Sequence, residues 1–248
     1  MPGSFAVSVC FTLFCRSASG LLCRALLPAV LLCATASAAT TPPDINALIS
    51  YHTLEVSPDG ITQQHSYKER WIRTADTLWS ERLIPLPVAR AFHQIHDNSK
   101  TPHKHFMYQM AARWVTQQPD QSLSLVYVDH YHKNQVYYPP MEYGQAGFNP
   151  DWTSLSQLFN PALLADFTAT DEEAPAGARW YQREQGNTIM RVLWSDTLQL
   201  ALALDRHTRD GYKQYRMEVK LKTPLAADRL PWLKLEEYDR KEISDFFD

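Results

Sequence analysis

The chain has 248 residues, with 24 lysines and arginines against 27 aspartates and glutamates, and a formal net charge of −3 at pH 7. A mildly acidic chain is a poor candidate for binding nucleic acid or an anionic membrane surface, because both attract clustered positive charge. The four cysteines lie within the first 33 residues, so the rest of the chain has neither a disulfide nor a thiolate metal site.

The N-terminal segment, residues 1–38, has the features of a secretory signal peptide. It contains no acidic residue, and its only charges are Arg16 and Arg24. An apolar run follows, shorter than the approximately 20 residues of a membrane-spanning helix. The small residues at 36–38 then match a cleavage site. We therefore expect export to the periplasm and cleavage at residue 38 or one residue later. The remaining chain, 39–248, is expected to be a single domain without a membrane span.

Most of the remaining chain is predicted to form β-strands. Its segments alternate apolar and polar residues and are separated by short turns. The first turn, "SPDG" at 57–60, has proline and glycine where a tight turn requires them. The expected strands are 46–56, 61–73, 77–85, 105–115, 122–132, 179–185, 188–196, 198–208 and 212–224, with 134–143 extending the fifth or following it as a short strand.

Two segments depart from this alternation. Residues 149–170 place apolar side chains at helical spacing, with Asp151 or Thr153 available as an N-cap and Pro161 ending or restarting the helix. The C-terminal segment, 230–248, is charged and aromatic and predicts a helical tail. The expected class is α+β, a curved, largely antiparallel sheet or incomplete β-barrel of eight to nine strands with a helical lid.

Two stretches resemble the periplasmic lipoprotein carrier and receptor superfamily (LolA/LolB-like). One is "YKERWIRTADTLWSERLIP" at 67–85, and the other is "VLWSDTLQLALALDRHTRDGYKQYRMEVKL" at 192–221. The order of strands and the position of the helical insert also agree, over most of 45–222. The resemblance implies a helical lid over an apolar cavity, and a carrier, sensor or chaperone of the envelope rather than an enzyme. Its expected partner is a hydrophobic ligand or an envelope lipoprotein, and no functional residue of the superfamily can be matched here.

Bulky apolar residues on the predicted strands and helix are the candidates for lining such a cavity. Seven tryptophans and twelve tyrosines are more aromatic surface than a small core requires, which favours a ligand site. The alternative is that these side chains fill a solid core. The candidates are Trp71, Trp79, Tyr108, Met110, Trp114, Tyr127 and Trp152, with Leu125 and Leu193 as further members.

Two His-x-His pairs suggest a metal site as an alternative function. If the loop between the fourth and fifth strands holds four residues, Trp114 lies opposite Leu123 and His105 opposite His132. All four histidines then share one face, within reach of one Cu²⁺ or Zn²⁺ ion. A looser pair, His93 and His96, lies in a predicted loop. The plainer alternative is that they face solvent. The four candidate ligands are His103, His105, His130 and His132.

Common catalytic motifs are missing from the sequence. It contains no glycine-rich phosphate loop, no Gly-x-Ser-x-Gly and no His-Glu-x-x-His. The favoured hypothesis is therefore a non-enzymatic periplasmic protein that holds a hydrophobic ligand or lipoprotein without a cofactor. The alternatives are a copper- or zinc-binding accessory protein and a hydrolase with an unidentified site.

Overall fold

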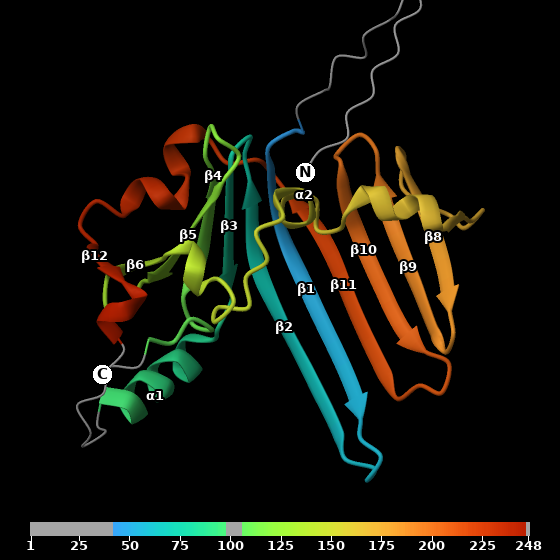
Figure 1. Ribbon diagram of the computed structural model, residues 1–248, viewed down its shortest axis with the longest axis horizontal. Helices are drawn as coiled ribbons and strands as arrows, with labels where there is room; N and C mark the ends of the chain where they lie inside the picture. The colour runs from blue at the N-terminus through green and yellow to red at the C-terminus, as the bar shows by residue number, and fades with distance from the viewer. Residues whose placement is uncertain (1–41, 98–105, 247–248) are drawn as a thin grey trace, which may run out of the picture. The chain divides into compact units, whose positions relative to one another are not determined.

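The computed structural model describes residues 42–97 and 106–246, and within them it forms one curved sheet of twelve strands (Figure 1). The strands are β1 (Ile45–Val56), β2 (Thr62–Arg73), β3 (Thr77–Arg82), β4 (Ala112–Gln117), β5 (Leu123–Asp129), β6 (Asn134–Tyr138), β7 (Thr168–Ala169), β8 (Ala178–Gln185), β9 (Thr188–Ser195), β10 (Leu200–Thr208), β11 (Lys213–Lys222) and β12 (Asp239–Glu242). Their order across the sheet is β12-β6-β5-β4-β3-β2-β1-β11-β10-β9-β8-β7. Neighbouring strands are antiparallel, except for the parallel pair of β12 and β6.

Helices are short in the described part of the chain. They are α1 (Leu86–Asp97), α2 (Trp152–Gln157) and the 3-10 helices η1 (Pro140–Glu142), η2 (Pro161–Asp166), η3 (Ala227–Arg229), η4 (Pro231–Lys234) and η5 (Ile243–Phe246). Among these residues, no helix has the length and apolar character needed to cross a membrane.

The predicted curved and largely antiparallel sheet is confirmed, but the predicted number of eight to nine strands is wrong. Both edge strands escaped prediction because neither has the alternating pattern of a half-buried strand. β7 has only two residues, and β12 consists of four charged residues. The C-terminal segment, expected as a helical tail, consists of 3-10 helices around β12.

The segment before β4 also differs from the prediction. The expected loop that contains His93 and His96 is the helix α1, which starts just after Pro85 and tolerates a proline in its first turn. The expected strand 105–115 begins only at Ala112. Residues 107–111 form turns instead, in which the Met110 amide donates to the Met107 carbonyl over 2.9 Å.

The pairing of β4 with β5 is shifted from the predicted register. Trp114 lies opposite Val126, and Gln117 is the residue opposite Leu123. The connecting loop is one residue longer than assumed, and Gln121 takes a positive φ of 68° within it. Because side chains alternate between faces, this longer loop places Trp114 on the opposite face from Leu125. The sequence-based expectation that Trp114 and Leu125 line the same apolar face is therefore wrong.

The main hydrophobic core lies on the concave face of the sheet. Leu125 on β5 and Val192 on β9 belong to one buried cluster although five strands or more separate them in the sheet, because the sheet curves around this cluster. Trp152 and Leu155 of α2 pack against the same cluster, near one end of the strands (Figure 1). The predicted packing of the helical segment against one face is thus confirmed.

A second, smaller core lies on the convex face. It contains Ile72 and Trp79, together with Leu235 from the C-terminal segment that crosses β2 to β5 there. Trp114 and Trp232 are partly buried in the same cluster. This C-terminal segment therefore covers the convex side of the sheet.

Arg73, at the end of β2, connects three separate segments. Its side chain is 1% exposed, and its guanidinium donates hydrogen bonds to the carbonyls of Pro43, Ser156, Leu198 and Gln199. The shortest of these bonds, to Leu198, is 2.7 Å long. Burial lowers the pKa of Arg73 to about 10, an effect that the charge of Asp44 opposes. Arg73 thereby fixes α2 and the β9–β10 turn to the start of β1.

Candidate functional site

The seven predicted cavity residues do not line one common surface. Trp71 and Tyr127 are buried in the concave core, and Trp152 packs against that core from α2. Trp79 and Trp114 lie on the convex face beneath the C-terminal segment. Tyr108 and Met110 precede β4, where the ring of Tyr108 lies 6.2 Å from that of Tyr127.

A tyrosine band, made of Tyr51, Tyr67 and Tyr215, crosses the concave face beyond the buried core. Tyr51 pairs with Tyr67 across β1 and β2, and their rings stack with centroids 4.8 Å apart. The ring of Tyr215 on β11 lies 6.5 Å from that of Tyr51. All three side chains are half-buried. Sequence reasoning missed this band because it appears only when the register of β2, β1 and β11 is known.

Burial changes the pKa values of tyrosines in this band and of Tyr138 on β6, so their ionisation reports whether the protein is folded. It raises the pKa of Tyr215 and Tyr138 to about 12, from a usual value of 10.0, and also raises that of Tyr51. The folded state thus favours the neutral phenols, and this contribution is lost as pH rises from about 10 to about 12. The lowered pKa of Arg73 acts in the opposite direction, but it is one group against three.

We therefore expect the free energy of unfolding in urea to fall between about pH 10 and about pH 12. A titration followed by phenolate absorbance checks the cause, because a group of tyrosines should ionise later in the native protein than in urea. Identical titration curves with and without urea would contradict the predicted burial.

A charged cluster, made of Glu69, Arg82 and Arg113, adjoins the tyrosine band. Glu69 lies directly opposite Arg82 on β2 and β3, and the Arg82 guanidinium carbon lies 3.9 Å from the centre of the Tyr67 ring. Burial raises the pKa of Glu69, and the charges of Arg113 and Arg82 oppose this rise. The three side chains are half-buried. This surface therefore combines aromatic rings with both signs of charge.

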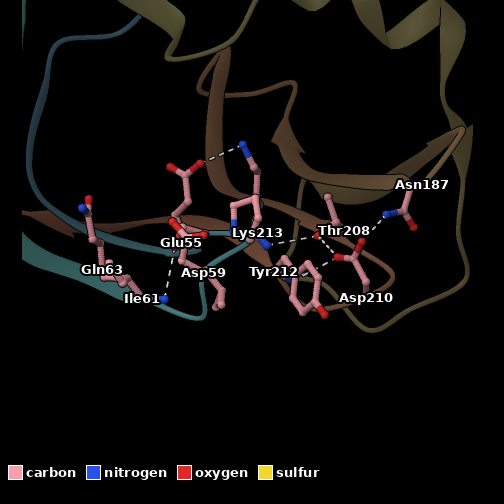
Figure 2. Close-up of a pocket in the computed structure, with 12 residues that line it drawn as sticks. Glu55, Asp59, Ile61, Gln63, Asn187, Thr208, Asp210, Tyr212 and Lys213 are labelled. Carbon is pink, nitrogen blue, oxygen red and sulfur yellow. Dashed lines mark hydrogen bonds and ion pairs between the residues drawn. The ribbon is translucent and has the colours of Figure 1, made fainter.

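The concave face continues toward the β1–β2, β8–β9 and β10–β11 turns, at the opposite end from α2 (Figure 1). A hollow of about 400 Å³ has Tyr215 in its wall, and it adjoins a hollow of about 740 Å³ at the turns themselves. Figure 2 shows the larger one, where Lys213 and Glu55 form an ion pair of 2.7 Å. Ile61 and Tyr212 at its rim are 61% and 57% exposed. Apolar side chains are thus available to a ligand along this end of the sheet.

The two described candidate histidines are engaged by different partners. His130 Nδ1 lies 2.9 Å from the hydroxyl of Tyr238, and its Nε2 lies 3.8 Å from Glu81. His132 Nδ1 lies 2.7 Å from an Asp129 carboxylate oxygen, in the turn after β5. The His130 imidazole is thus oriented by the C-terminal segment, and that of His132 by Asp129 at the start of its own turn.

The other two candidate ligands, His103 and His105, lie outside the described residues. The register that placed His105 opposite His132 is wrong, since β4 begins only at Ala112 and pairs differently. Within residues 42–97 and 106–246, no group of three or more potential metal ligands is found. The copper or zinc site therefore stays a prediction from the sequence.

No protein-family model matches the chain, and neither does any curated protein. Solved structures do match. An uncharacterised conserved protein from Thermus thermophilus is 10% identical, with 79% of this chain and 90% of that chain covered and a TM-score of 0.35. A putative outer membrane lipoprotein-sorting protein domain from Vibrio parahaemolyticus is 8% identical, with coverages of 77% and 91% and a TM-score of 0.34. A LolA superfamily protein from Nitrosomonas europaea is 6% identical, with coverages of 75% and 90% and a TM-score of 0.29.

Structures of the superfamily that the sequence resembles are therefore among the matches. TM-scores this low carry no argument about ligand, partner or chemistry.

Proposed function

We propose that this protein is an exported, non-enzymatic binding protein that holds a hydrophobic ligand, or the acyl chains of an envelope lipoprotein, on the concave face of its sheet. The observation that carries the proposal is the continuity of the tyrosine band with the two hollows beside it. Tyr215 belongs to the band and also lines the smaller hollow.

The surface combines apolar rings for the chain of an amphiphile with polar side chains, such as Thr53, His65 and Arg206 of the smaller hollow. Stacked tyrosine rings offer flat apolar faces, and exposed Ile61 and Tyr212 extend the apolar surface to the sheet end. Hollows of a few hundred cubic ångströms are typical of ligand sites. The half-buried tyrosine hydroxyls would meet the polar part of an amphiphile.

The test is binding of a fluorescent fatty acid whose emission rises in apolar surroundings. The protein is expressed from its full sequence in a Gram-negative host and recovered from the periplasmic fraction. We expect saturable binding, weakened about tenfold in Tyr67→Ala, because the substitution removes a ring from the proposed binding surface.

The matched control is Tyr137→Ala, which removes an exposed tyrosine from β6 on the opposite face of the sheet. Affinity should be unchanged in this variant. Absence of saturable binding to the unmodified protein, or equal losses in the two variants, would refute the proposal.

A further inference from the structure

The charged cluster differs from four other arginine positions on the sheet, whose guanidinium groups are paired with carboxylates. Arg191 pairs with Glu172, Arg209 with Glu184, Arg216 with Asp205, and Arg183 with Asp166. Within the described residues, in contrast, neither Glu69, Arg82 nor Arg113 takes part in an ion pair. Desolvated charges are costly unless they are paired. Half-buried charges of both signs that lie side by side without a close ion pair can bind oppositely charged groups of a ligand.

The strands place these three side chains at neighbouring positions on the concave face. Arg82 is held over the face of Tyr67 by a cation–π contact. Arg113 lies opposite Ser80 on β3 and opposite Tyr127 on β5. Burial raises the pKa values of Tyr51, Tyr67 and Tyr127, and the charge of Arg113 opposes the rise in each case. The charge of Arg113 thus acts on tyrosines of three strands, β1, β2 and β5.

We infer that the charged cluster recognises the zwitterionic head of an amphiphile, a phosphate joined to a primary ammonium, with the apolar chains lying along the tyrosine band. This inference rests on the proposed function and specifies its ligand class. Guanidinium groups bind phosphate oxygens through directed N–H bonds, so Arg82 and Arg113 would hold the phosphate. Glu69 and the neighbouring tyrosine rings would hold the ammonium.

The charges of the cluster favour this head over a purely anionic one. A phosphate alone satisfies the two arginines but leaves Glu69 unpaired beside another anion. A head with a separated ammonium gives each of the three side chains an opposite charge. The cluster therefore offers an opposite charge to each charged group of the head.

The experiment is displacement of the fluorescent fatty acid from the full protein by three compounds. Two are short-chain phospholipids with the same acyl chains, one with a phosphoethanolamine head and one with a phosphoglycerol head. The third is glycerophosphoethanolamine, which has the head without the chains. We expect the phosphoethanolamine lipid to bind about tenfold more tightly than the phosphoglycerol lipid, and the chainless head to bind much more weakly than either.

Substitutions assign the preference to residues. Glu69→Gln should abolish the difference between the two lipids, and Arg113→Gln should weaken both lipids. The matched control is Glu81→Gln, because Glu81 and Arg70 form the neighbouring cross-strand pair on the opposite face. This control should keep the full preference.

Equal affinities of the unmodified protein for the two lipids would overturn the inference, and that result needs no variant to fold. Equal affinities would not contradict the proposed function, provided that the fatty acid still binds. Tight binding of glycerophosphoethanolamine would also overturn it, since the cluster would then be a site for a soluble head. Failure to bind the fatty acid and every lipid would instead refute the proposed function itself.

Discussion

Replacing Arg73 with methionine is expected to lower the free energy of unfolding by about 4 kcal/mol. The side chain is almost fully buried, and its guanidinium serves four carbonyl oxygens from three segments. Methionine fills much of the space but leaves those carbonyls without their donor, which costs more than the loss of an exposed charge. Urea denaturation followed by tryptophan fluorescence measures the change.

Arg73→Lys tests whether the positive charge alone is sufficient. The lysine ammonium keeps the charge but lacks the planar set of donors that reaches all four carbonyls. We expect Arg73→Lys to be nearly as destabilised as Arg73→Met. Lys68→Met is the control, since Lys68 lies on the same strand but is exposed, and its effect should stay within about 0.5 kcal/mol. Comparable stability of Arg73→Met and Lys68→Met would show that the buried hydrogen bonds contribute little.

Replacing Leu235 with alanine is expected to cost about 3 kcal/mol of unfolding free energy. Leu235 is 3% exposed and closes the convex core over Ile72 and Trp79. Its carbonyl also accepts a hydrogen bond of 2.9 Å from the Gln135 side chain. The substitution leaves a cavity between the C-terminal segment and the sheet, and unfolding in urea reports the loss.

Leu233→Ala provides a matched control two residues earlier in the same segment. Leu233 is 51% exposed, so the same change in side chain should cost less than about 0.5 kcal/mol. Equal effects at both positions would mean that the C-terminal segment does not form the convex core. Both variants should bind the fatty acid as the unmodified protein does, because neither residue faces the concave side.

The two cores of the sheet have separate roles in this interpretation. The convex core is closed by the chain itself, through Leu235 and its neighbours. On the concave face, α2 and η2 cover the core near one end, while the tyrosine band and hollows lie toward the other. Arg73 anchors that covering segment. The unclosed part of the concave face is therefore where we place the ligand.

Several features of this protein follow from the sequence alone, because they depend on local patterns. Alternation of apolar and polar residues identified most of the strands, and the turn at 57–60 followed from its proline and glycine. Helical spacing after Asp151 identified the segment that packs on the concave face, and Asp151 caps α2 as predicted. Such signals are carried by residues that are close together in the chain.

Other features depended on contacts between distant residues. One additional residue in the loop between β4 and β5 moved Trp114 to the convex face, and no local pattern shows the length of that loop in advance. The parallel pairing of β12 with β6 joins segments about a hundred residues apart. The tyrosine band and the unpaired Glu69, Arg82 and Arg113 exist only after registers across several strands are set. Local sequence thus determined which segments become strands, whereas tertiary pairing decided which side chains share a face, because each strand offers two faces and register alone selects between them.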